Sequence, residues 1–96
     1  MAVIVRVPHG MAWCVGNQKT VEASGATVRE LWQSLHTSYP ELMWRLSKEQ
    51  GSPSFWVRIA VDGRPIEELE GLDTRLRPDS VVALQVLEGA APGGSL

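Results

Sequence analysis

The chain has 96 residues, 44% hydrophobic and 21% charged, and nine basic against eleven acidic residues give it a net charge of −2. This is typical of one globular domain with a single small core. The charge balance argues against a nucleic-acid partner or a polybasic membrane contact. Its apolar runs are far shorter than the roughly 20 residues that span a bilayer. Because no signal peptide is recognisable, we expect a cytoplasmic location.

The first half of the chain predicts two strands and two helices. Alternation from Met1 to Val7 indicates a strand, and Gln18 to Ala23 indicates a short second strand, antiparallel to the first, after a loop. Thr27-Val-Arg-Glu30 has the form of a capping box, which predicts a helix start. Tyr39-Pro40 ends that helix, and Pro40 can open a shorter one through about Lys48. The apolar stripe of the first helix, expected to lie on the sheet, consists of Val28, Leu31, Trp32 and Leu35.

The second half predicts mainly strands. Phe55 to Val61 is expected to form the clearest strand, with Phe55, Val57, Ile59 and Val61 on one face and Trp56, Arg58 and Ala60 on the other. Asp62-Gly63 predicts a turn into a short segment near Arg64 to Ile66, and Glu67 to Arg77 predicts turns or a single helical turn. In the final strand, Ser80 to Leu87, the alternation predicts Val82, Leu84 and Val86 inside and Ala83, Gln85 and Leu87 outside.

This element order indicates an α+β fold of the β-grasp, ubiquitin-like type. A mixed sheet wraps one main helix, and the last strand lies centrally beside the first. We expect a β-grasp domain over residues 1–88 and a flexible tail over residues 89–96.

Few side chains are candidates for chemistry. Cys14 is the only cysteine, which excludes an internal disulfide and a paired-cysteine zinc site, and we interpret it as a partly buried, inert thiol. His9 and His36 have no second ligand at metal-binding spacing, so both are interpreted as structural or solvent-facing. With no nucleophile-base pair or paired carboxylates, we expect neither a catalytic site nor a metal site, and no enzyme activity.

The end of the chain is the most distinctive segment. Gly93-Gly94 is followed only by Ser95-Leu96. Consecutive glycines let an extended backbone enter a channel too narrow for side chains. A frayed terminus is the alternative reading of the tail taken alone.

Several segments, in this order and spacing, resemble one family. They are Thr27-Val-Arg-Glu-Leu31, Tyr39-Pro-Glu-Leu42, Ile59-Ala-Val-Asp-Gly63, Gly71 to Asp79 and the terminal Gly93-Gly94. Together they resemble the ubiquitin-like sulfur carriers, the MoaD/ThiS family of the molybdopterin-synthase small subunit and the thiamine sulfur carrier. Lys19 to Gly25 and the long segment before Phe55 look most like the CysO-type carrier that feeds cysteine biosynthesis in actinobacteria.

The resemblance implies that Gly94 carries a thiocarboxylate, with Gly93 beside it. An adenylating enzyme would activate the carboxyl group with ATP and Mg²⁺, and a sulfur-accepting synthase would take the sulfur; the carrier itself would bind no cofactor. Because Ser95-Leu96 lies beyond the diglycine, we expect a JAMM-type metalloprotease to remove it. The alternative is that these two residues are foreign to the native protein.

Two other functions stay open at this stage. A protein modifier would use the same Gly94 to form isopeptide bonds with lysines, and a noncovalent ubiquitin-like adaptor would have an inert tail. For any of them, Trp56, if it faces outward, would form an exposed docking patch next to the tail. The candidate patch comprises Trp56, Arg58, Ala60, Ala83 and Leu87.

Overall fold

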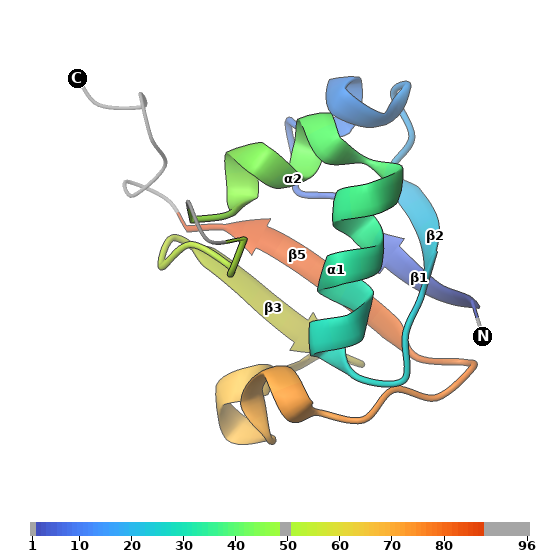
Figure 1. Cartoon of the computed structure of the whole chain (residues 1–96), viewed down its shortest axis with the longest axis vertical. Helices are drawn as coiled ribbons and strands as arrows, with labels where there is room; N and C mark the ends of the chain where they lie inside the picture. The colour runs from blue at the N-terminus through green and yellow to red at the C-terminus, as the bar shows by residue number, and fades with distance from the viewer. Residues whose placement is uncertain (1, 49–50, 88–96) are drawn as a thin grey trace.

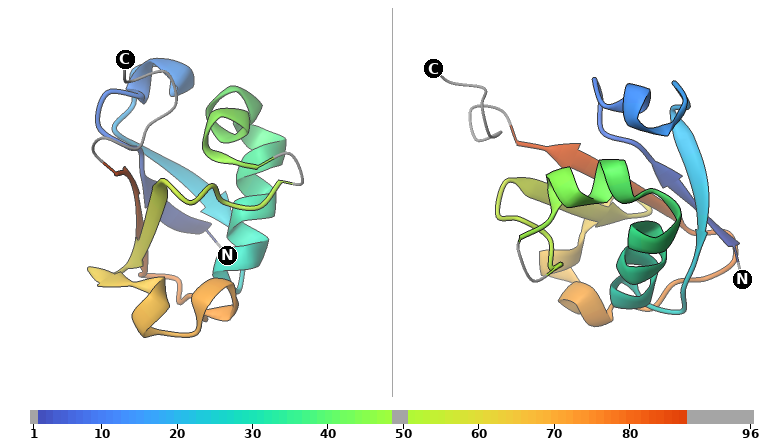
Figure 2. Two further views of the ribbon diagram at one scale, coloured as in Figure 1. Left: turned by 90° about the vertical axis from the view of Figure 1, so that its left-hand side faces the viewer. Right: turned by 45° about the horizontal axis from the view of Figure 1, so that its top comes forward.

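The computed structural model describes residues 2–48 and 51–87, and these form a five-stranded mixed sheet with helices on one face (Figures 1 and 2). The strand order is β2-β1-β5-β3-β4. The strands are β1 (Ala2–Arg6), β2 (Thr20–Ser24), β3 (Val57–Val61), β4 (Arg64–Pro65) and β5 (Val81–Val86).

The last strand occupies the centre of the sheet. β5 pairs in parallel with β1, where Val5 lies opposite Val82, and antiparallel with β3, where Ile59 lies opposite Leu84. β1 also pairs antiparallel with β2. The predicted β-grasp topology is therefore confirmed, and the chain leaves the domain from a strand that is hydrogen-bonded on both sides.

Helix α1 (Val28–Ser38) lies across the sheet (Figure 1). The Thr27 hydroxyl accepts a hydrogen bond from the Glu30 amide at 3.2 Å, and the Glu30 carboxylate accepts one from the Ala26 amide at 3.0 Å. These two bonds satisfy donors that a helix start leaves free. The predicted stripe is buried in full, including Trp32 at 3% exposure.

Two short helices pack together beyond the C-terminal end of α1. α2 (Pro40–Leu46) begins at the proline that ends α1, and it buries Leu42, Met43 and Leu46. The 3-10 helix η1 (Ala12–Val15) contacts α2 and lies in a segment that the sequence predicted to be a loop. It ends at Gly16, whose φ of 69° is easily adopted by glycine.

The turn after β3 is the type that the sequence predicted. Asp62 and Gly63 have φ values of 51° and 86°, as expected for a tight hairpin into β4. The Asp62 carboxylate also accepts a hydrogen bond from the Val81 amide at 2.9 Å, which ties the hairpin to the start of β5. The single-turn helices η2 (Ile66–Glu68) and η3 (Gly71–Asp73) follow, as predicted for this region.

One strand start differs from the prediction. The Val57 amide donates to the Ser54 carbonyl oxygen at 3.1 Å, so Phe55 and Trp56 form a turn and β3 begins only at Val57. A turn breaks the two-residue alternation on which the prediction depended. Phe55, predicted to share one face of the strand with Val57, is 80% exposed, whereas Trp56, predicted on the other face, is buried at 8%.

Candidate functional site

The predicted chemical site lies outside the described residues. Gly93, Gly94, Ser95 and Leu96 all belong to the segment after Leu87. The structure does describe where this segment starts: the Leu87 amide donates a hydrogen bond to the Trp56 carbonyl oxygen at 2.8 Å. The seven residues that follow Leu87, up to Gly94, span at most about 23–25 Å at about 3.3–3.6 Å per residue. An enzyme that acts on Gly94 must therefore lie close to this end of the sheet.

The uncovered face of the sheet has two alanines side by side at its centre. The register places Ala83 of β5 between Arg6 of β1 and Ala60 of β3. Together with neighbouring side chains that include Arg58 and Gln85, they line a shallow depression. Because the side chains of Ala60 and Ala83 are small, the side chains of a partner can approach the sheet backbone closely here.

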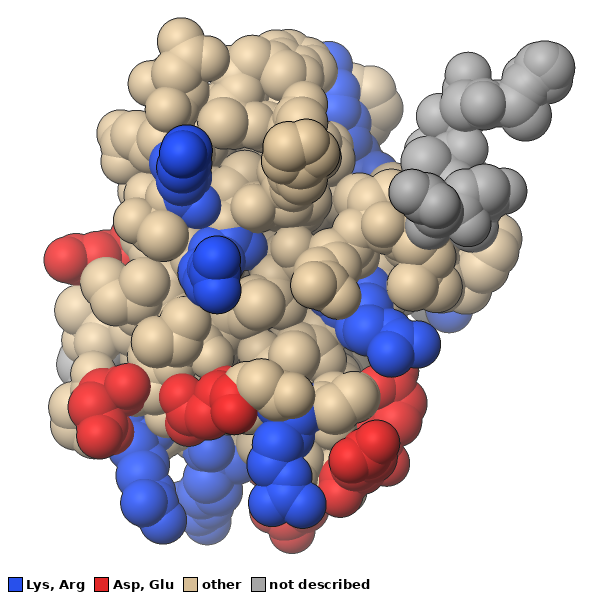
Figure 3. All heavy atoms as spheres, turned by 180° about the vertical axis from the view of Figure 1, so that it is seen from behind, with Lys and Arg blue, Asp and Glu red and all other residues tan. Residues whose placement is uncertain are grey.

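The charge on this face is unevenly distributed. Figure 3 views the molecule from the side opposite the helices, and its acidic side chains lie mostly toward the lower edge of this view. Arg6 and Arg58 are both exposed residues of this face. A partner surface that covers the depression would therefore meet two guanidinium groups, which are suited to bidentate contacts with carboxylates.

Four of the five predicted docking residues remain candidates for one surface. Arg58, Ala60 and Ala83 lie together on the open face, and Leu87 directly follows β5 on its way out of the domain. The prediction that Trp56 is an exposed member of this patch is wrong. The turn at residues 54–57 rotates its side chain away from the open face and into the core, where it is 8% exposed.

A second surface lies beside the point where the chain leaves the sheet. It is a groove of about 690 Å³, and its lining includes Trp56, whose carbonyl oxygen accepts the Leu87 hydrogen bond, and Val86, which precedes Leu87. The full lining consists of His9, Met11, Trp44, Arg45, Ser47, Ser54, Trp56 and Val86.

A stack of two tryptophans and an arginine stands at this groove. The Arg45 guanidinium lies 4.9 Å from the ring centroid of Trp13 and 4.7 Å from that of Trp44, so it contacts one indole from η1 and one from α2. Both rings are largely exposed, at 55% and 65%. Exposed aromatic groups with an arginine are typical of binding surfaces. We call this set of three residues the Trp–Arg–Trp stack.

Sequence reasoning missed this stack, although part of the signal was present. Leu42, Met43 and Leu46 define the buried face of α2, and the helical period places Trp44 on the opposite face. Its exposure could therefore have been predicted. The meeting of Trp13 with Arg45 could not, because it depends on the contact between η1 and α2.

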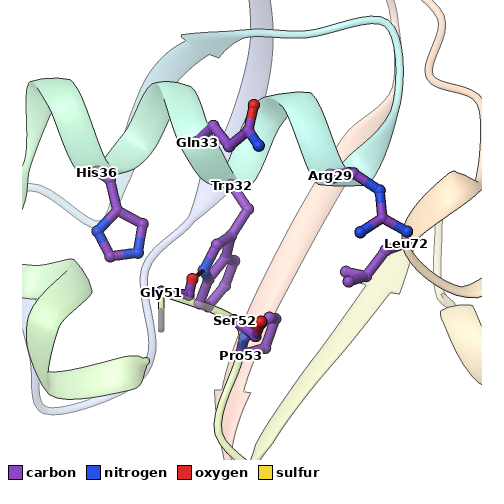
Figure 4. A pocket seen from close by; sticks show the side chains of 8 residues that line it. All are labelled: Arg29, Trp32, Gln33, His36, Gly51, Ser52, Pro53 and Leu72. Atoms are coloured by element: carbon purple, nitrogen blue, oxygen red, sulfur yellow. Dashed lines mark hydrogen bonds between the residues drawn. The ribbon is translucent and has the colours of Figure 1, made fainter. Parts of the chain in front are cut away.

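A third hollow lies between α1 and the segment Gly51–Pro53 (Figure 4). The Trp32 indole crosses it and donates a hydrogen bond to the Gly51 carbonyl oxygen at 2.8 Å. At its ends, Arg29 pairs with Asp73 at 3.2 Å, and His36 Nε2 lies 2.9 Å from the Ser47 hydroxyl. The Trp32–Gly51 bond holds the segment against α1, and the Arg29–Asp73 pair joins α1 to η3. The His36–Ser47 contact joins α1 to the end of α2, which gives His36 a structural role.

The thiol of Cys14 is poorly suited to nucleophilic chemistry. It is partly buried, and burial raises its pKa, an effect that nearby Arg45 opposes and Glu41 reinforces. A raised pKa keeps the thiol protonated at neutral pH, when the thiolate is the reactive form.

Over residues 2–48 and 51–87, the structure has no group of three metal-ligating side chains. In the same part of the chain, no helix has the length and apolar character needed to cross a membrane.

Comparison with known proteins decides the family. Residues 5–84, from β1 to within β5, match the ThiS family. The chain belongs to the ThiS family. The resemblance to ubiquitin-like sulfur carriers of the MoaD/ThiS type is thereby confirmed. No curated protein matches the sequence significantly.

Solved structures similar to this ThiS-family chain share its fold. CysO in the Amycolatopsis orientalis BexX/CysO complex is 24% identical with a TM-score of 0.78, and the match covers 88% of this chain and 94% of that one. Mycobacterium tuberculosis CysO is 26% identical with a TM-score of 0.77, covering 88% and 98%. Small archaeal modifier protein 1 from Methanosarcina acetivorans is 21% identical with a TM-score of 0.82, covering 92% and 94%.

Proposed function

We propose that this ThiS-family protein is a sulfur carrier that bears a thiocarboxylate on Gly94. The observation that carries the proposal is the combination of a family match over residues 5–84 with a Gly93-Gly94 pair seven residues beyond the end of the central strand. The domain serves as a handle, and the diglycine carboxyl group is the reacting end. The carrier binds no cofactor and is not itself an enzyme.

The proposed chemistry has three steps. Hydrolysis of the Gly94–Ser95 peptide bond by a JAMM-type metalloprotease releases Ser95-Leu96 and exposes the Gly94 carboxylate. An adenylating enzyme then joins that carboxylate to AMP from ATP, with Mg²⁺, and releases pyrophosphate. Hydrosulfide attacks the acyl carbon and displaces AMP, which leaves the thiocarboxylate and releases a proton. A sulfur-accepting synthase takes the sulfur for the biosynthesis of cysteine, a cofactor or a specialised metabolite.

The geometry supports a partner-binding role for the uncovered sheet face. Ala83 lies on β5, the strand that leads to the tail, Arg58 and Ala60 lie on the neighbouring β3, and Leu87 directly follows β5. We assign the first contact with the adenylating enzyme to this face. CysO has been solved in complex with BexX, which supports a protein partner for the fold.

A second candidate function is protein modification through the same Gly94. The similarity to a small archaeal modifier protein favours it, with a TM-score of 0.82. In this case a lysine amine, in place of hydrosulfide, displaces AMP and forms an isopeptide bond. A noncovalent adaptor would need neither reaction.

One experiment separates these functions. A chain that ends at Gly94 is incubated with an adenylating partner, ATP and sulfide, and the products are analysed by intact-mass spectrometry. Replacement of one oxygen by sulfur supports the carrier, lysine conjugates support the modifier, and neither product supports the adaptor. The full chain ending at Leu96 is the matched control, which should stay unchanged unless the protease is added. Its modification without processing would contradict the proposed order of steps.

A further inference from the structure

The groove beside the Trp–Arg–Trp stack differs in chemistry from the open sheet face. Its apolar lining residues include Trp56, Val86 and Met11, and Trp44 adds a second aromatic side chain. Among its lining side chains, His9 and Arg45 are basic and none is acidic. The groove therefore fits an apolar, extended segment that carries negative charge.

The guanidinium of Arg45 retains donors for such a segment. Its Nη1 donates to the Glu41 carbonyl oxygen at 2.7 Å, and the Glu41 carboxylate lies 3.9 Å from the same nitrogen. These contacts involve one of three guanidinium nitrogens, whereas the whole group offers five N–H donors. Stacking on Trp13 and Trp44 holds the group in a fixed plane at the edge of the groove.

We propose that the segment Glu88–Leu96 of the same chain occupies this groove. The segment begins at the groove itself, because Val86 is part of the lining and Leu87 is hydrogen-bonded to Trp56. Nine residues follow Leu87 in the sequence, and an extended segment of this size spans up to about 30 Å. The proposed occupant is therefore covalently attached at the groove, which favours it over a separate molecule.

The composition of this segment complements the groove. It contains Ala90-Ala91-Pro92, and proline-containing extended segments dock in aromatic-lined grooves at low entropic cost. It also carries a negative charge on the Glu88 side chain. The Glu88 carboxylate complements the positive charge of Arg45, and the Leu96 side chain suits the apolar part of the lining.

Tethering makes even weak binding significant. A segment joined by a short flexible link is present at about millimolar effective concentration, so an affinity of about 1 mM already keeps the groove occupied about half of the time. A docked segment would be withheld from the enzymes that act on Gly94. Removal of Ser95-Leu96 would delete the leucine side chain and so weaken docking, which would free the tail for activation.

The four tryptophans supply the test, because each indole N–H gives its own resonance in a ¹⁵N-labelled protein. The full chain is compared with a chain that ends at Gly89. We expect the indole resonances of Trp44 and Trp56 to shift, while Trp32, which donates to Gly51 beneath α1, stays unchanged. A synthetic peptide with the sequence of Glu88–Leu96 should restore the shifts to the shortened chain at about millimolar concentration.

Two variants test the chemistry of docking. Arg45→Gln should reduce the differences in indole chemical shift between the full and shortened chains several-fold. Trp44→Ala should abolish the difference for the Trp56 indole. Phe55→Ala is the matched control, since Phe55 is an exposed aromatic residue outside the groove lining.

Identical indole resonances in the full and shortened chains would overturn the proposal. Shifts that grow with protein concentration would overturn it in favour of the tail of a second copy. The measurement uses neither ATP nor sulfide, so its failure would leave the proposed sulfur chemistry standing.

Discussion

Trp56 and Phe55 are neighbours in the sequence with opposite surroundings, and they provide a direct test of the turn before β3. Trp56 is 8% exposed and Phe55 is 80% exposed. Burial of a tryptophan removes roughly 150–250 Å² from water, worth about 4–6 kcal/mol at about 25 cal/mol per Å². Measured tryptophan-to-alanine changes in cores cost about 3–5 kcal/mol. We therefore expect Trp56→Ala to lower the free energy of unfolding by about 3–5 kcal/mol.

Phe55→Ala is the control and should change the free energy of unfolding by less than about 0.5 kcal/mol, because surface substitutions rarely exceed this. Urea unfolding followed by far-ultraviolet circular dichroism measures both without depending on tryptophan fluorescence. With a slope of about 1–3 kcal/mol per molar urea, Trp56→Ala should lower the midpoint by roughly 1–3 M or more, or prevent folding. If Phe55→Ala were the more damaging change, or if the two variants were equally stable, the assigned turn would be wrong.

Three further predictions concern other parts of the domain. Thr27→Ala should cost about 1 kcal/mol in a thermal melt, whereas Thr27→Ser should keep the cap, because the hydroxyl accepts from the Glu30 amide. Gly25→Ala should destabilise by about 1–3 kcal/mol or more, because a Cβ there would lie 2.5 Å from the Leu31 backbone nitrogen; wild-type stability would contradict this close approach. Burial raises the pKa of Cys14, so its alkylation rate should rise at a higher pH in the folded chain than in urea. The free energy of unfolding should fall as the pH rises from the unfolded pKa of this thiol through its folded pKa. Equal pH profiles in the two states would refute that assignment.

Periodicity and capping signals predicted the main elements of the fold. The helix stripe and the alternation in β5 each span several residues, and only one packing arrangement buries them. The prediction for β3 was wrong at the start of the strand. A single hydrogen bond, from the Val57 amide to the Ser54 carbonyl oxygen, makes a turn of Phe55 and Trp56, and the two-residue alternation begins only after it. Local composition contains no strong signal for such a bond, since residues 55 and 56 are both good strand formers.

The candidate surfaces were predictable to different degrees. Arg58, Ala60 and Ala83 share a face by strand alternation, so the sequence could place them together. The Trp–Arg–Trp stack joins residues about thirty positions apart through the packing of η1 on α2. η1 itself is a short 3-10 helix, an element whose hydrogen-bond pattern leaves little trace in hydrophobic periodicity. Its position had to come from the structure.

The location of the last strand bears on how a partner can handle the tail. β5 is hydrogen-bonded to β1 on one side and to β3 on the other, and the Leu87–Trp56 bond continues the second ladder to the edge of the described domain. A pull on the tail along the strand direction loads both ladders in shear, so many hydrogen bonds resist together. Were the tail attached to an edge strand such as β4, which has two residues, the same pull could peel that strand away one bond at a time. An enzyme that draws a diglycine into a narrow channel can therefore grip this chain firmly without unfolding the domain that carries it.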